Sequence, residues 1–133
     1  MEDFVTIEEA QDHLSIDSDS DADEQWLFVW IPIVCEAVRA WLKDPWRPYE
    51  VTRDAVGAVV IDEGGNPKVA TDREGKPIVL QRVRAAVLIE LAKIYAGREG
   101  EGTAEVPEHW GYGYVLGAGA TRMLAASRKP TVA

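Results

Sequence analysis

The chain has 133 residues, which is enough for one domain with a single hydrophobic core and too few for two independent ones. Its 23 acidic and 14 basic residues leave a formal net charge of -9, which repels nucleic-acid phosphates and argues against a protein that grips DNA through a basic surface. A hydrophobic fraction of 47% is ordinary for a globular protein and argues against a chain that is disordered throughout.

Two helices are predicted in the first part of the chain. Thr6 and Glu9 have the spacing of a capping box, which predicts a short helix ending at about Leu14. After an acidic loop, a long central helix is predicted from about Ala22 to Asp44, because its polar residues fall on one side and the rest are apolar or small. Pro32 lies on the polar side and predicts a kink. The expected core seam is Trp26, Trp30, Ile33, Ala37 and Trp41.

The apolar run 26–38 within this helix bears on membrane contact. It is shorter than the roughly 20 residues that a membrane span requires, and Glu36 interrupts it, so we expect a core helix and no membrane contact. Cys35 lies in the same run. It is the one cysteine of the chain, and we expect a buried, unreactive thiol in a protein of the reducing cytoplasm.

Residues 51–77 break the helical pattern. Short runs rich in β-branched residues at 59–61 and 68–70 are separated by the turn-forming segment 62–67, and a second turn follows at 72–76. This pattern predicts a β-hairpin or an extended loop inserted between the second and third main helices.

A third helix is predicted from about Pro77 to Ala96, with Gly97 as its C-terminal stop. Its expected core stripe is Leu80, Val83, Val87, Leu91 and Ile94. A second, smaller apolar strip indicates contact with either another helix or a neighbouring subunit, and it comprises Ala85, Ile89 and Ala92.

The last part of the chain begins with a glycine-rich polar segment, residues 98–113, which predicts a loop. Tyr112 and Tyr114 stand among its glycines, an arrangement that lets the backbone pass close to a neighbour while the rings provide contact area. A last short helix is predicted from about Val115 to Ser127, followed by a loose tail at 128–133. Its basic cluster either complements a helix dipole or docks on an acidic surface of a partner, and it consists of Arg122, Arg128 and Lys129.

These elements together predict a mainly α protein. Its single domain, residues 1–127, would be a small bundle of about four helices with an insertion at 51–77. The acidic N-terminus lacks the charged-then-apolar pattern of a secretory signal.

No segment has a specific catalytic or metal-binding pattern. The three aspartates of residues 17–21 have the spacing of EF-hand ligands, but the glycine and bidentate-acid positions of that loop hold other residue types. His13 and His109 are far apart in the sequence, and the glycines of residues 111–119 lack the flanking strand and Lys-Ser/Thr of a phosphate loop. We therefore expect no cofactor, no metal and no enzymatic activity.

Residues 5–17, VTIEEAQDHLSID, resemble the beginning of the head-tail connector (adaptor) proteins of tailed phages, in which a capped helix ends in a turn of this kind before an acidic loop. Residues 36–42 resemble the second helix of that family, and residues 83–95 resemble its third. The segment 51–76 is longer than the family pattern.

The resemblance implies a helical subunit that forms a ring, dodecameric to match the portal, between the portal protein and the next neck or tail component. DNA would pass through its channel without specific binding, and the protein would reside in the virion neck after assembly in the host cytoplasm. The family has no catalytic residues. We assign the insertion and eight residues as candidate contacts with the portal or a neighbouring subunit: Ala85, Ile89, Ala92, Tyr112, Tyr114, Arg122, Arg128 and Lys129.

Two alternatives belong to other functional classes. A soluble acidic regulator or DNA mimic would bind a nucleic-acid-binding partner through carboxylates spaced along one face. A small helical enzyme subunit would need a deep pocket with a strongly perturbed ionisable group.

Overall fold

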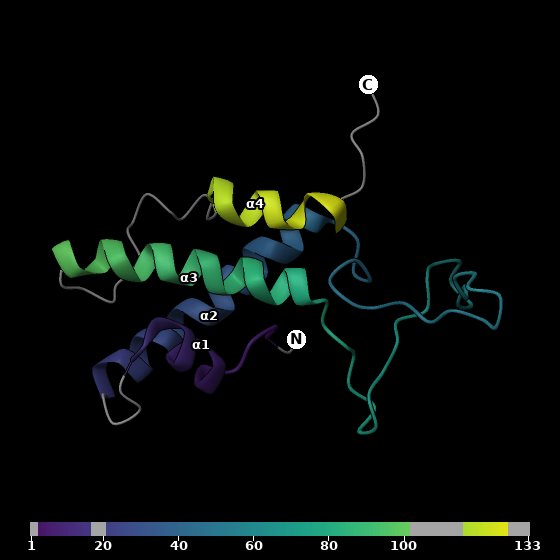
Figure 1. The fold of residues 1–133 in the computed structure, drawn as a ribbon, viewed down its shortest axis with the longest axis horizontal. Helices are drawn as coiled ribbons and strands as arrows, with labels where there is room; N and C mark the ends of the chain where they lie inside the picture. The colour runs from purple at the N-terminus through teal and green to yellow at the C-terminus, as the bar shows by residue number, and fades with distance from the viewer. Residues whose placement is uncertain (1–2, 17–20, 102–115, 128–133) are drawn as a thin grey trace.

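The computed structural model describes residues 3–16, 21–101 and 116–127, with side chains placed up to residue 97 in the second range. Within these ranges the chain forms four α-helices and one 3-10 helix (Figure 1): α1 (Ile7–Leu14), α2 (Asp21–Leu42), α3 (Gln81–Glu101), α4 (Ala118–Leu124) and the 3-10 helix Ala125–Ser127. The predicted mainly α fold is therefore confirmed. The predicted tail, residues 128–133, lies outside the described residues.

The capping box at the start of α1 is confirmed. The Glu9 backbone N–H donates to the Thr6 hydroxyl over 3.1 Å, and the Thr6 backbone N–H donates to the Glu9 carboxylate over 3.3 Å. The other carboxylate oxygen of Glu9 accepts a hydrogen bond from Arg84 of α3. One glutamate thus both starts α1 and ties it to the third helix.

Helix α2 is central and continues through Pro32, which is exposed. Trp26 and Trp30 are buried as predicted, whereas Ile33, Ala37 and Trp41 are half-buried and pack against the core. The fully buried face of α2 is rotated about the helix axis from the predicted seam, because α1 and α3 both pack against this helix. It comprises Trp26, Leu27, Trp30, Ile31, Val34, Cys35, Val38 and Leu42.

By length and composition alone, α2 could cross a membrane, because it has 22 residues. The apolar run 26–38 therefore underestimated the length of the helix, because α2 extends beyond the run on both sides. Side chains such as Leu27, Val34 and Val38 are covered by this chain's own core. That burial, rather than length, marks α2 as a core helix.

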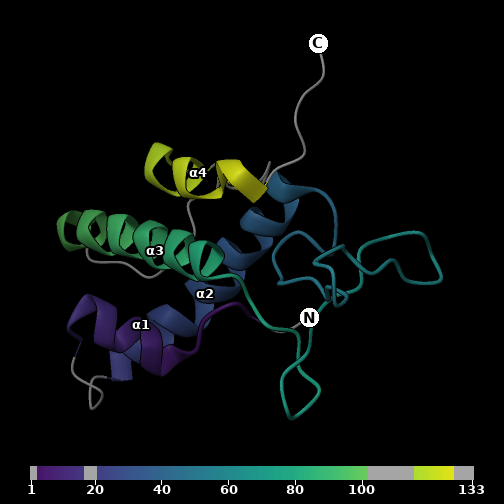
Figure 2. The ribbon, with the colours of Figure 1, turned by 45° about the vertical axis from the view of Figure 1, so that its right-hand side comes forward.

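Helix α3 lies beside α4 and crosses α2 (Figures 1 and 2). Its predicted core stripe is confirmed at Val83, Val87 and Leu91, which are fully buried. The predicted start at Pro77 is wrong, because residues 77–80 are extended and the helix begins at Gln81. The Leu80 backbone N–H, for example, donates to the Pro48 carbonyl over 3.0 Å. The predicted stop at Gly97 is also wrong, since no positive φ angle ends the helix there.

Residues 50–79, here called the arm, project from the helices (Figures 1 and 2). The predicted β-hairpin is not found: the arm contains isolated antiparallel bridges and no strand. The reason lies in a cycle of three backbone hydrogen bonds. Thr52 donates to Lys68 over 2.7 Å, Lys68 to Val60 over 2.8 Å, and Val60 back to Thr52 over 2.9 Å.

A second cycle of the same kind lies nearer the helices. Glu50 donates to Ile78 over 2.8 Å, Ile78 to Ala70 over 3.0 Å, and Ala70 to Glu50 over 2.8 Å. In both cycles each segment donates to one neighbour and accepts from the other. No two segments can therefore build a continuous two-stranded ladder, although the backbone groups in the two cycles are paired.

Three turns of the arm share one construction, a repeat that the sequence analysis missed. Asp54, Asp62 and Asp72 each accept, at Oδ1, the backbone N–H groups two and four residues later, over 2.8–3.0 Å. Three residues after each aspartate stands a glycine with a φ of 81–85°. The shared pattern Asp-x-x-Gly thus specifies each turn by a side-chain cap and a left-handed residue.

We expect Asp62→Ala to loosen its turn without unfolding the helices, because it removes two side-chain hydrogen bonds in an exposed part of the arm. At about 0.5–1.5 kcal/mol per bond, amide hydrogen exchange at Gly64 and Asn66 should accelerate about two- to tenfold, while the Tm of the bundle stays nearly constant. Glu63→Ala, in the same turn, is the control and should leave exchange unchanged. Equal exchange in both variants would contradict the role of the aspartate.

Candidate functional site

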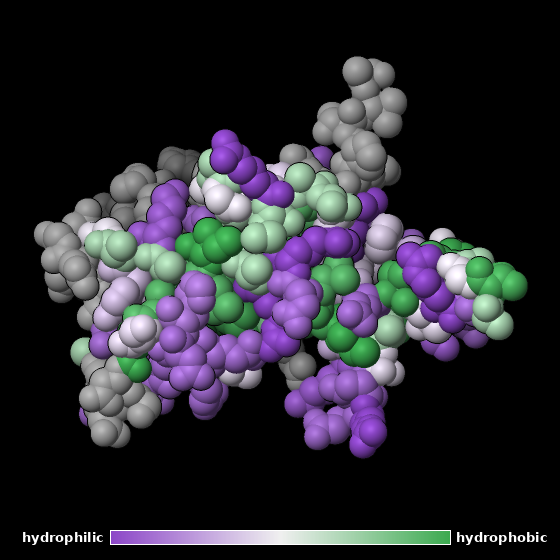
Figure 3. All heavy atoms as spheres, viewed as in Figure 1, coloured by the Kyte–Doolittle hydropathy of each residue, from purple (hydrophilic) through white to green (hydrophobic). Residues whose placement is uncertain are grey.

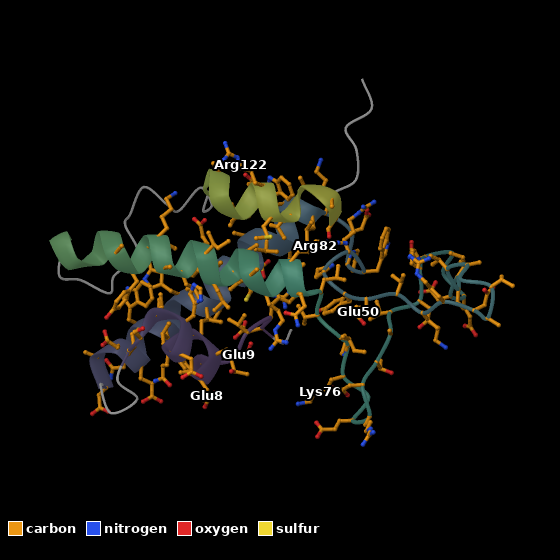
Figure 4. All side chains as sticks on the ribbon, in the orientation of Figure 1. Glu8, Glu9, Glu50, Lys76, Arg82 and Arg122 are labelled. Carbon is orange, nitrogen blue, oxygen red and sulfur yellow. The ribbon has the colours of Figure 1, made fainter. Side chains whose placement is uncertain are left out.

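A pocket of about 410 Å³ lies where the base of the arm, the start of α3 and the 3-10 helix meet. Two aromatic side chains and three arginines dominate its lining, which is unusual in so acidic a chain: Trp46, Tyr49, Arg47, Arg53 and Arg82. Glu50, Val51, Leu80, Ala126 and Ser127 complete the lining. Figure 4 places Glu50 and Arg82 near the beginning of α3, at the base of the arm.

Contacts within the chain hold two of the arginines in place. Arg47 donates from Nε to Asp44 over 2.6 Å and from Nη1 to the Ser127 carbonyl over 3.1 Å, and its guanidinium lies 4.4 Å from the centre of the Trp46 ring. Arg82 donates from Nε to the Ser127 hydroxyl. The end of the 3-10 helix is thereby tied to the base of the arm, and the guanidinium groups are preorganised.

Arg53 and Glu50 form the more open side of the pocket. Arg53 is exposed and donates from Nη1 to the Gly57 carbonyl over 2.9 Å. Glu50 is exposed as well, and Asp44 is engaged by Arg47. Three cations against one open carboxylate leave the pocket positive, and with its aromatic walls it suits an acidic group next to an apolar one.

The arm also carries exposed apolar residues. Val56, in the first turn, is 88% exposed, and Ile61, just before the second turn, is 56% exposed. Figure 3 shows hydrophobic residues among hydrophilic ones on the part of the molecule that projects to the right, where the arm lies. Apolar side chains on a projecting element are typical of contact surfaces.

A third exposed apolar residue lies near the start of α2. Phe28 is 72% exposed and, with Asp21, Glu24 and Gln25, lines a shallow hollow of about 230 Å³. The four residues have the spacing of one helix face. This aromatic side chain therefore stands in an acidic setting.

The predicted interface residues are only partly described. Ala85, Ile89 and Ala92 are half-buried on α3. Ile89 faces α4 of the same chain, because a Cβ added to Gly119 would lie 3.1 Å from its Cγ2 atom. Arg122 is exposed on α4 and points away from the bundle (Figure 4). The other four predicted residues lie outside the described residues: Tyr112, Tyr114, Arg128 and Lys129.

One buried carboxylate was missed by the sequence analysis. Glu90 is 1% exposed, and its carboxylate accepts the Gly117 backbone N–H over 3.1 Å. It thus helps fix the start of α4 on α3. The signal was present in the sequence, because Glu90 stands between the core positions Val87 and Leu91.

In the described part of the chain, no group of three or more His, Cys, Asp or Glu side chains is placed to hold a metal ion. Cys35 is buried, and its sulfur accepts the Phe4 backbone N–H over 3.4 Å. Burial raises the pKa of this thiol from 9.0 to about 11. Its thiolate, the reactive form, is therefore suppressed at neutral pH.

We expect Cys35 to resist a thiol reagent such as iodoacetamide in the native protein at pH 8 and to react readily in urea, as followed by mass spectrometry. Its effect on stability has a defined sign. The unfolded chain loses the thiol proton above pH 9.0 while the folded chain holds it to about 11, so stability is unaffected below that window and falls within it. Cys35→Ser should remove this part of the alkaline fall, and rapid native labelling would contradict the buried thiol.

No family model matches the chain, and neither a curated protein nor a solved structure matches it. The resemblance of residues 5–17, 36–42 and 83–95 to phage connectors thus stays a prediction that these comparisons leave open.

Proposed function

We propose that the protein is a structural subunit of a phage neck, forming a ring that joins the portal to the next neck or tail component and extends the DNA channel. The observation that carries this proposal is the arm. It projects from a helical bundle, its shape is set by two cycles of backbone hydrogen bonds, and it exposes Val56 and Ile61. These properties are those of an element that reaches a neighbouring subunit.

The construction of the arm supports an assembly role over a linker role. Most residues of the arm are exposed, and so it adds little to the core of the bundle. A flexible linker would not need three capped turns, because glycine and serine alone provide reach. A preorganised arm, in contrast, loses less conformational entropy when it binds, which favours a specific contact.

Charge gives a second line of support. A net charge of -9 would make the wall of a ring repel the phosphates of passing DNA. The capped helix of the connector resemblance is also present, since Thr6 and Glu9 begin α1 as the family pattern requires. We infer a mechanical role without catalysis, in keeping with a thiol that is buried and a carboxylate, Glu90, that accepts a backbone N–H.

The acidic regulator, or DNA mimic, is favoured less because many carboxylates serve the fold itself. Glu9 caps α1, Glu90 holds the start of α4, and Asp44 pairs with Arg47. Three further aspartates cap the turns of the arm. A mimic would instead need its carboxylates open and aligned on one face.

The test mixes purified protein with portal rings from the same phage genome and follows sedimentation and negative-stain images. We expect a stoichiometric ring capping the portal. Val56→Asp should keep the circular dichroism spectrum and Tm, because Val56 is 88% exposed, yet weaken ring formation at least tenfold. Ala40→Asp, the same charge change at an exposed position of α2, is the control.

A monomer in the absence of portal would agree with the proposal, since weak contacts become strong when many act on one template. Intact, folded protein that fails to bind the portal at high concentration would contradict it. That result would favour another neck component or the acidic regulator.

A further inference from the structure

Two surface features of the chain are complementary in charge and in apolar character. The first, here called the Phe28 knob, is the exposed ring of Phe28 with Asp21 and Glu24 on the same face at the start of α2. The second is the pocket at the base of the arm with its three arginines, here called the arginine pocket. An aromatic ring flanked by carboxylates fits a cavity flanked by guanidinium groups and aromatic walls.

The knob is poorly explained by the fold of a single chain. Phe28 is 72% exposed, although removing an aromatic ring from water is favourable. Asp21 and Glu24 lie in the first turn of α2, where they suit the helix dipole, and neither forms an ion pair with another of the described residues. Glu24 lies one turn and Asp21 two turns before Phe28, so both carboxylates share one helix face with the aromatic ring.

The arginine pocket has the matching properties. Its volume is about 410 Å³, and it is open to solvent. Arg47 and Arg82 are held by Ser127, so their guanidinium groups are fixed before any partner arrives. Arg53 is exposed at its edge and free to turn toward a carboxylate, since its bond to Gly57 is a surface contact.

The two features lie at opposite ends of the molecule. In Figures 1 and 2, α2 begins at the end of the bundle that is farthest from the arm, whereas the pocket sits at the base of the arm. They cannot meet within one chain. They can meet between copies, and a contact between two different surfaces of identical subunits repeats head to tail and closes into a ring when the rotation allows.

We infer that the arginine pocket receives the Phe28 knob of a second copy of this chain. Glu24 and Asp21 of one copy would pair with the open guanidinium groups of the next, and the ring of Phe28 would lie against Trp46 and Tyr49. The inference rests on the proposed ring and specifies its subunit contact. Because the contact combines ion pairs with a buried aromatic ring, salt should weaken it without abolishing it.

A charge exchange tests the pairing directly. Glu24→Arg and Arg53→Glu should each lower self-association at least tenfold, since each places like charges at the contact. An equimolar mixture of the two variants should restore it, because an alternating ring then pairs opposite charges at every contact. Chemical cross-linking of concentrated protein, in parallel samples with and without portal, measures the effect.

Matched controls make comparable changes elsewhere. Glu8→Arg on α1 and Lys43→Glu directly after α2 are exposed and lie outside both the arm and the arginine pocket, and they should leave cross-linking unchanged. Phe28→Ser should lower cross-linking at least tenfold with an unchanged Tm, whereas Met123→Ser, at another partly exposed apolar residue, should not.

The outcomes separate this contact from the neck function. Single variants that associate like wild type, or a mixture that fails to restore association, would overturn the contact while portal binding still supports the neck. Restored association in a protein that does not bind portal would keep the contact and remove the neck function. Wild-type protein that forms no oligomer, with or without portal, overturns the contact.

Discussion

The fold depends on covering the broad apolar face of α2, which includes Trp26, Leu27, Val34, Val38 and Leu42. These side chains leave water only where another helix packs on them. Helices α1 and α3 both pack against α2 and against each other, and α4 packs against α3. The buried Glu90 and the Arg84–Glu9 pair then fix the order of these layers by polar contacts.

The arm meets a different constraint, because its backbone donors and acceptors need partners without a sheet. Cycles of three hydrogen bonds satisfy them, and the three aspartate-capped turns set the bends between segments. The result is an element of defined shape that leaves apolar side chains such as Val56 open. Rigidity and exposure together connect this part of the fold to the proposed assembly role.

The arginine pocket joins the arm to the bundle. Ser127 accepts from both Arg47 and Arg82, so the end of the helical part and the base of the arm share one polar junction. A positive pocket at this junction, in a chain of net charge -9, concentrates attraction for acidic groups in one place. A ring subunit with an acidic knob at its other end would use this polarity to set the direction of assembly.

Local patterns in the sequence determined the helices. The spacing of Thr6 and Glu9 specified the start of α1, and the 3.6-residue period specified α2 and the core stripe of α3, because these signals act between residues close in the chain. The tertiary structure decided the rest. The runs 59–61 and 68–70 do not form a hairpin because residues 50–54 take part of their hydrogen bonding. The pocket that contains Arg47, Arg53 and Arg82 forms only on folding. Contacts between segments distant in the sequence produce no periodic pattern of residue types from which they could be predicted.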